Sequence, residues 1–231
     1  MPVWSTRRLE KFLIFSLGLL LVAGFPLVQA SAQYSIPANG RFSTFTIGIQ
    51  IPEAPKWAHD VVVNATIAWK QAQKWYQQNI QDGPIYTFVE SSTASVTVSF
   101  SVPAAYSSFA VAWTAYKFAP SSKTNIISAQ VFLTQNVFSQ AQENNSTARQ
   151  YAFRLALHEL GHVLGLGHVL DGKDIMDPRG PAYLATQQPL ISTLDLYAIH
   201  TLASNTTVPT FITLPSTVTY QLIDARTFLA A

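Results

Sequence analysis

Residues 158–168 read His-Glu-Leu-Gly-His-Val-Leu-Gly-Leu-Gly-His, and this stretch decides how the rest of the chain is interpreted. His158 and His162 are four residues apart, so on an α-helix both imidazole rings project from one face, one turn apart. Two ring nitrogens at that spacing can bind one metal ion. Gly165 can adopt a positive φ and end the helix, so that the chain turns back and His168 supplies a third nitrogen.

Glu159 lies next to the first of these histidines, about 100° around the helix. At that angle its carboxylate is poorly placed as a ligand but well placed to contact a water on the metal. Three neutral imidazoles leave the fourth tetrahedral position open, which is the arrangement of a catalytic zinc site. The alternative is a core helix whose histidines are merely hydrogen-bonded. It is disfavoured because three of the five histidines of the chain fall within these eleven residues.

The same stretch resembles the zinc signature of metzincin metalloproteases, H-E-x-x-H-x-x-G-x-x-H. Metzincins also carry a methionine in a turn after the third histidine, and Asp174-Ile-Met-Asp-Pro178 fits, with Met176 eight residues after His168. Within that group the sequence is most similar to the matrixins. The resemblance implies an α+β fold with a five-stranded twisted mixed sheet, two long helices, a zinc cleft, a Met-turn and a C-terminal helix.

Hydrophobic periodicity along the chain predicts the same order of elements. Alternating or β-rich runs predict strands at residues 42–51, 85–90, 95–102, 109–118 and 126–134. Helical spacing predicts helices at 56–80, 148–166 and 192–203, the last with a capping box formed by Ser192 and Asp195. The resemblance covers about residues 42–203 and is strong from residue 151 onward.

Three segments are predicted. Residues 1–32 resemble an export signal, with a basic head, an apolar run at 12–28 and small residues at 30–32 for cleavage. An uncleaved membrane anchor is the alternative, but the apolar run is short for a membrane span. Residues 33–203 form the predicted catalytic domain, and residues 204–231 a tail in which no motif is found. The protein is therefore expected to be secreted, or membrane-anchored if the segment is retained.

Composition excludes several classes of function. The chain has no cysteine, so it has neither disulfides nor a thiolate nucleophile, and it lacks the cysteine-based latency that matrixins use. Removing residues 1–32 removes three basic residues and one acidic residue, which leaves 11 of each. Such a sparsely charged, neutral chain has no basic footprint for nucleic acid. We expect a monomer.

By the resemblance, the chain is a zinc endopeptidase that uses one catalytic zinc ion, bound by His158, His162 and His168. Glu159 would act as general base toward the attacking water and pass the proton to the leaving amine. Met176 would form an apolar floor beneath the ligands. Gly165 would have a structural role. Asp195 would either steady the Met-turn or simply cap its helix.

The resemblance also implies that residues 109–118 form an antiparallel edge strand along which an extended peptide substrate binds. An ordinary strand is the alternative for that segment. Met176-Asp-Pro178 replaces the usual Met-Tyr-Pro, and the Pro-x-Tyr of the specificity pocket is absent, with Pro181-Ala-Tyr183 offset by three residues. These departures leave the side-chain preference open.

Other functions and sites receive less support from the sequence. A catalytically idle binding or adhesion module is the second hypothesis, but the intact base and ligands argue against it. His59 is predicted to be a surface or packing residue, because no partner stands at ligand spacing in its helix. His59 and His200 are too few for the second zinc site of many matrixins. Whether calcium binds is unknown, since the acidic residues are few and unclustered in the sequence.

Overall fold

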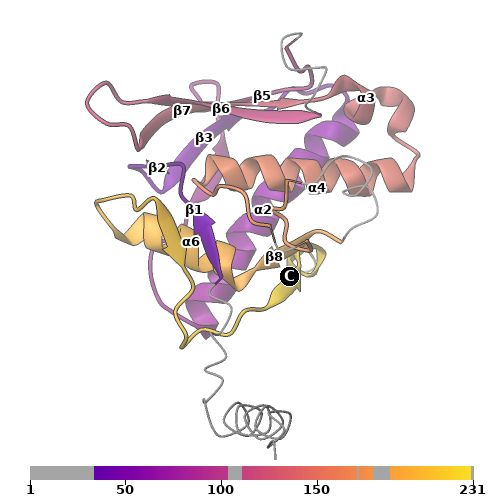
Figure 1. The fold of residues 1–231 in the computed structure, drawn as a ribbon. Coiled ribbons are helices and arrows are strands. Elements are labelled where there is room, and N and C mark those ends of the chain that lie inside the picture. Colours follow the sequence, from indigo (N-terminus) through magenta and orange to yellow (C-terminus); the bar gives the residue numbers. More distant parts are fainter. Residues whose placement is uncertain (1–33, 104–110, 171, 179–187, 230–231) are drawn as a thin grey trace, which may run out of the picture. The chain divides into compact units, whose positions relative to one another are not determined.

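The centre of the fold is a mostly parallel β-sheet, seen at the top of Figure 1. The computed structural model describes residues 34–103, 111–170, 172–178 and 188–229. The parallel strands are β3 (Thr46–Gln50), β4 (Thr87–Glu90), β5 (Val96–Ser99) and β7 (Asn125–Leu133). They lie in the order β7-β5-β3-β4. The predicted α+β class is confirmed.

Two further strands pair with β7. β6 (Ala112–Phe118) runs antiparallel to β7, as predicted for residues 109–118, and its first two predicted residues lie outside the described ones. β5 and β6 both pair with Val131, so they flank β7 on opposite sides. β2 (Arg41–Phe42) adds a short parallel pair at the start of β7, which gives a six-stranded sheet instead of the five strands expected. The strand predicted at 42–51 is broken, because the chain is exposed and bent at residues 43–45 between β2 and β3.

Helices α2 (Lys56–Asn79) and α4 (Ser146–Val163) pack on each other below the sheet (Figure 1). Buried residues recur at helical spacing along α2, from Trp57 to Tyr76, which is the pattern of one apolar face. The indole Nε1 of Trp69 donates a 2.8 Å hydrogen bond to the carbonyl of Leu157, so the two helices are joined by a buried polar contact as well as by packing. α3 (Gln135–Phe138), the 3-10 turn η1 (Gln140–Gln142) and α6 (Thr193–Ser204) complete the described helical elements before the tail.

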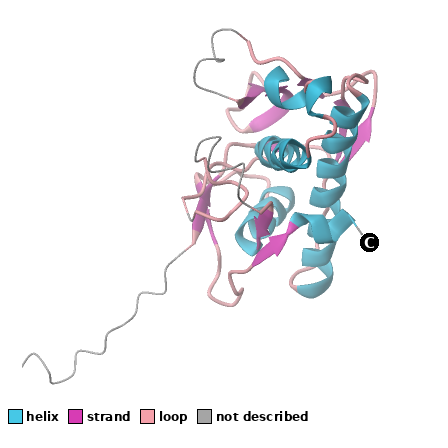
Figure 2. Cartoon of the chain, turned by 90° about the vertical axis from the view of Figure 1, so that its right-hand side faces the viewer, coloured by secondary structure: helices cyan, strands magenta, loops and turns pink. Residues whose placement is uncertain are grey.

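The tail, in which no sequence motif is found, packs against the rest of the domain. β9 (Phe211–Thr213) pairs antiparallel with β1 (Ser35–Pro37), and β10 (Leu222–Asp224) pairs antiparallel with β8 (Leu190–Ser192). The 3-10 helix η2 (Ala225–Leu229) contacts α2. These two short pairs are separate from the main sheet. The rotated view in Figure 2 shows strands, in magenta, among the helices below the upper group of strands.

The predicted export signal at residues 1–32 lies outside the described residues. Among the helices that the structure describes, none combines the length and hydropathy needed to cross a membrane.

Candidate metal centre

Three imidazole rings meet where α4 ends. One ring nitrogen from each of His158, His162 and His168 lies within 4.8 Å of the other two. The Nε2 atoms of His162 and His168 are 3.1 Å apart, close to the separation of about 3.4 Å between two ligands of a tetrahedral zinc ion. The structure therefore brings together the three residues that the motif predicts as ligands.

The turn that delivers the third histidine depends on Gly165. α4 ends in a Schellman arrangement: the N–H of Leu166 donates to the Gly161 carbonyl at 3.1 Å, and the N–H of Gly165 donates to the His162 carbonyl at 2.7 Å. Gly165 has φ +97°. A Cβ there would lie 2.1 Å from the Gly40 carbonyl oxygen, so both conformation and space require glycine.

Residues from the beginning of the described chain hold this turn in place. The backbone N–H of Asn39 donates to the Gly165 carbonyl at 2.8 Å, and its side-chain amide donates to the Leu166 carbonyl at 2.8 Å. The N–H of Gly167 donates to the Pro37 carbonyl at 2.7 Å. These contacts were not predicted, because nothing in the local pattern of residues 33–41 points to a partner so distant in the chain.

Hydrogen bonds at Nδ1 fix the orientation of two of these imidazoles. Nδ1 of His158 lies 2.7 Å from the Ile175 carbonyl, and Nδ1 of His162 lies 2.8 Å from the Leu166 carbonyl. Because a carbonyl oxygen only accepts, each Nδ1 carries the proton and each neutral ring keeps its Nε2 lone pair free. Both carbonyl contacts therefore leave the Nε2 atoms able to bind a metal ion.

Burial keeps the three rings neutral. Desolvation lowers the pKa of His158 to about 4 and lowers the pKa of His162 well below its usual value. Burial also lowers the pKa of His168, against an opposing effect of the Asp177 carboxylate. At neutral pH the imidazoles are thus in the uncharged form that binds a metal ion.

Glu159, which follows His158 on α4, is buried, with only 4% of its surface exposed. Burial raises the pKa of its carboxyl to about 7, while a hydrogen bond from Thr114 acts in the opposite direction. The Thr114 hydroxyl lies 2.6 Å from Glu159 Oε2, and Thr114 belongs to the edge strand β6. A carboxyl group that titrates near neutrality is suited to accept and return a proton. Thr114 was not predicted from the sequence, because it is 45 positions away from Glu159.

Met176, predicted as an apolar floor, is fully buried against the helix that carries His158 and His162. A Cβ built on Gly161 would lie 2.5 Å from the Met176 sulfur, so the glycine allows this close packing. Because Ile175 in the same turn accepts from His158, the Met-turn both packs against and hydrogen-bonds to the ligand helix.

The side chain of Asp174 hydrogen-bonds to the backbone of the Met-turn. Its Oδ1 accepts from the N–H of Met176 at 2.7 Å. Asp195 forms the predicted capping box: its Oδ2 accepts from the Ser192 N–H at 2.9 Å, and its own N–H donates to the Ser192 hydroxyl at 3.0 Å. Of the two roles proposed for Asp195, the structure thus confirms the cap. The pKa of Asp195 is raised well above its usual range by burial and by the Asp174 carboxylate.

The Asp177 carboxylate links the Met-turn to the segment after the third histidine. Its Oδ2 accepts from the N–H of Gly172 at 2.8 Å. In the same region the N–H of Val169 donates to the Met176 carbonyl at 3.0 Å. The aspartate that replaces the usual tyrosine of this turn is therefore buried and used structurally.

A family model described as matrixin matches residues 53–203, which is more than half of the chain. The chain belongs to the matrixin family. Matrixins are zinc metallopeptidases, and the neutral, converging imidazoles of this matrixin fit that ion by donor type, number and spacing.

Two further comparisons add little to this assignment. No curated protein matches the sequence of this matrixin. A solved structure described as the GM1-bound form of the ECX AB5 holotoxin is 11% identical with a TM-score of 0.42, and the match covers 74% of this chain and 88% of that chain. A likeness at that level carries no argument about function. Pro181 and Tyr183, which are offset by three residues from the usual Pro-x-Tyr, lie outside the described residues.

Proposed function

We propose that this matrixin is a zinc-dependent endopeptidase in which Glu159 is the general base. The observation that carries the proposal is a buried carboxyl group, that of Glu159, with a pKa raised to about 7, on the helix that also contributes two of the three converging imidazoles. His158, His162 and His168 would hold the ion. A purely structural zinc site has four protein ligands and does not need a neighbouring buried carboxyl group.

When bound, zinc acts as a Lewis acid that polarises the scissile carbonyl and makes a water molecule more acidic. Glu159 takes a proton from that water as its oxygen bonds to the carbonyl carbon. The carboxyl then gives the proton to the amide nitrogen as the C–N bond breaks, which leaves a free carboxylate and an amine. The Thr114 hydroxyl holds one Glu159 oxygen and so orients the carboxylate for both transfers.

We propose further that an extended peptide binds along β6. Among the described strands β6 pairs only with β7, so one of its two edges has backbone groups available for a further strand. Thr114 places this edge directly next to Glu159. Trp113, which is 40% exposed, offers an apolar contact for a substrate side chain.

The test of the peptidase proposal is a Glu159→Gln variant. We expect hydrolysis of casein or of a peptide library to fall by about 10²-fold or more, because the general base is lost, while zinc content stays that of wild type. Glu143→Gln, which removes a carboxylate on another element, is the matched control and should retain full activity. A Glu159→Gln protein as active as wild type would overturn the proposal. Wild-type protein that holds zinc yet cleaves no peptide would instead favour the idle binding module.

We also propose that residues 1–32 direct export and are removed, so that the mature enzyme is a secreted monomer. The support is compositional: a basic head, an apolar run and small residues follow one another in that segment. N-terminal sequencing of the exported protein should begin near residue 33. A mature protein that retains residue 1 and sediments with membranes would favour the anchored form.

A further inference from the structure

A second group of His and Glu side chains that could hold a metal ion lies near β4. This strand is at the opposite side of the sheet from β6, which contacts the candidate catalytic centre. The cluster comprises Glu53, His59 and Glu90, each offering one ligand atom within 4.8 Å of the others. Glu90 ends β4, and Glu53 lies between β3 and α2. β4 and β6 are separated by three strands, so the two edges are on the order of 20 Å apart.

The parallel pairing of β3 with β4 assembles this cluster. Ile49 of β3 is paired with Glu90 of β4, so the carboxyl ends of these two parallel strands lie side by side. The chain then passes from β3 through Glu53 into the first turns of α2, which carry His59. Neither carboxylate stands at helical spacing from the imidazole, which explains why the sequence predicted only a surface or packing role for His59.

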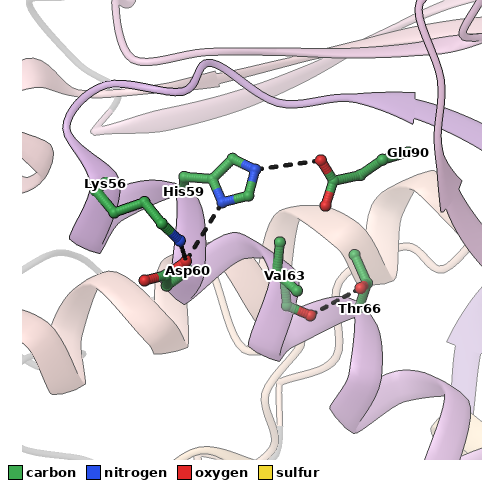
Figure 3. A network of polar contacts seen from close by, with 6 residues as sticks. All are labelled: Lys56, His59, Asp60, Val63, Thr66 and Glu90. Atoms are coloured by element: carbon green, nitrogen blue, oxygen red, sulfur yellow. Dashed lines mark hydrogen bonds and ion pairs between the residues drawn. The ribbon is translucent and has the colours of Figure 1, made fainter.

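The His59 ring is aimed at one carboxylate and steadied by another, as Figure 3 shows. Its Nε2 lies 3.2 Å from Glu90 Oε2, and its Nδ1 lies 3.4 Å from Asp60 Oδ1. The ring is only 8% exposed. A metal-bound histidine commonly donates its second N–H to a carboxylate in this way. In the tautomer that carries its proton on Nδ1, the ring directs its Nε2 lone pair at the Glu90 carboxylate, and a cation between the two groups would be bound by both.

The charges around the ring also point to a cation. Three carboxylates, from Glu53, Asp60 and Glu90, gather about one imidazole, and Lys56 pairs with Asp60. The remaining formal charge equals that of two carboxylates, which a divalent ion would neutralise.

We propose that Glu53, His59 and Glu90 bind a second divalent transition-metal ion, of which zinc is the model. The nitrogen ligand distinguishes this site from those of calcium and magnesium, which take oxygen ligands. The 3.2 Å separation of Nε2 and Oε2 is close to that of two ligands on one zinc ion, about 3.4 Å. Glu53 is exposed, so its side chain can move to complete the set.

The site is structural, since it joins three elements that no disulfide can join in a chain without cysteine. The ion would tie the loop before α2 and the first turns of that helix to the end of β4. It is independent of the proposed peptidase activity, because its ligands lie on the opposite edge of the sheet.

The test is the zinc content of the purified full chain. Protein is stripped with a chelator, dialysed against micromolar zinc chloride and analysed by atomic emission. We expect about two zinc ions per wild-type chain and about one per His59→Gln chain, with peptidase activity of the variant close to wild type. Equal zinc content in the two proteins would overturn the proposal, and would show that a proton on Nε2 holds the cluster together instead.

Exposed residues provide a test that does not disturb folding. Glu53→Gln should weaken the second zinc by about 10-fold or more and reduce the rise in Tm that zinc produces. Asp82→Asn, which removes one negative charge from an exposed loop, is the control and should change neither quantity. An equal effect of both substitutions would reveal nonspecific attraction and refute the site. Displacement of the second zinc by an equal concentration of calcium would refute the assignment to transition metals.

Discussion

At the scale of single residues, the pair of Thr114 and Glu159 couples the edge strand to the metal centre. The hydroxyl can donate its one proton to a single acceptor, and the 2.6 Å contact with Oε2 is shorter than the 3.3 Å contact with the Glu159 carbonyl. The bond favours the ionised carboxylate, in opposition to burial, which favours the neutral acid. Thr114 therefore sets both the orientation and the proton affinity of the proposed base.

Replacing Thr114 with valine should remove this bond and leave the shape of the strand unchanged. We expect the acid limb of the pH profile of kcat/KM to move to higher pH, because the pKa of Glu159 rises further above its present value of about 7. At neutral pH, kcat/KM should fall by about 10-fold, as for the loss of a hydrogen bond to a charged group. Thr114→Ser keeps the hydroxyl and should keep the wild-type profile. A profile unmoved in Thr114→Val would show that the contact does not act on the base.

The convergence of the three histidines could be predicted because their relation in the sequence is local. His158 and His162 share a helix face by spacing alone, and a glycine three residues later is a recognisable helix end. Thr114 and Asp174 could not be predicted, because their partners come from other elements and hydroxyls and carboxylates are common in every loop. For the same reason, the sequence could not predict that Glu53 and Glu90 lie close to His59.

At the scale of elements, long amphipathic helices were predicted well and short strands poorly. α2 begins and ends within one residue of its predicted bounds, because its buried face repeats along the whole helix. The single strand predicted at 42–51 is divided into β2 and β3, which pair with different strands. Alternation in the sequence does not show where the pairing with a neighbouring strand stops. β1 and β9 have three residues each, too few for any period to be recognised.

The junction between the Met-turn and α6 rests on two neighbouring buried carboxyls, Asp174 and Asp195. The raised pKa of Asp195 means that this carboxyl is favoured in its protonated form. An asparagine side chain is nearly isosteric with that form, so we expect the free energy of unfolding of Asp195→Asn at neutral pH to stay within about 0.5 kcal/mol of wild type. Asp195→Ala loses the cap on the Ser192 N–H and should be destabilised by about 1–2 kcal/mol.

The pH dependence of stability provides the second readout for this junction. A raised folded-state pKa contributes stability that is fully present below the unfolded-state pKa and is lost as pH rises through the folded-state value. Wild-type protein should therefore lose stability on the alkaline side of that value, whereas Asp195→Asn should not. An asparagine variant as unstable as the alanine variant in urea titrations would show that Asp195 is ionised in the native protein.

At the scale of the whole molecule, the tail is part of the core. Ile212, Leu214, Ala225 and Phe228 are buried, and η2 contacts the helix α2 on which α4 rests. The sequence could not reveal this, because tail strands of three residues bury their side chains only by pairing with β1 and β8. The order of the major elements was predictable from periodicity. The pairing of β1 with β9 and of β8 with β10 was not.

Phe228→Ala should test the contribution of the tail. Phe228 is 8% exposed, so we expect the free energy of unfolding to fall by about 3 kcal/mol, as for other large-to-small core substitutions. Phe211 in the same tail is 60% exposed, and Phe211→Ala should change stability by less than about 0.5 kcal/mol. Chemical denaturation of both variants measures the difference. Equal, small effects would mean that the tail is not part of the cooperative fold.

The contacts of Pro37 and Asn39 with the turn after α4 have a consequence for the order in which the protein comes apart on heating. His158 and His162 lie on the long helix α4, whereas His168 follows a turn that is held by hydrogen bonds from the beginning of the described chain. Fraying at that end would release the third imidazole while α4 is still intact. The ion would then escape ahead of global melting, and inactivation would precede the loss of helical structure.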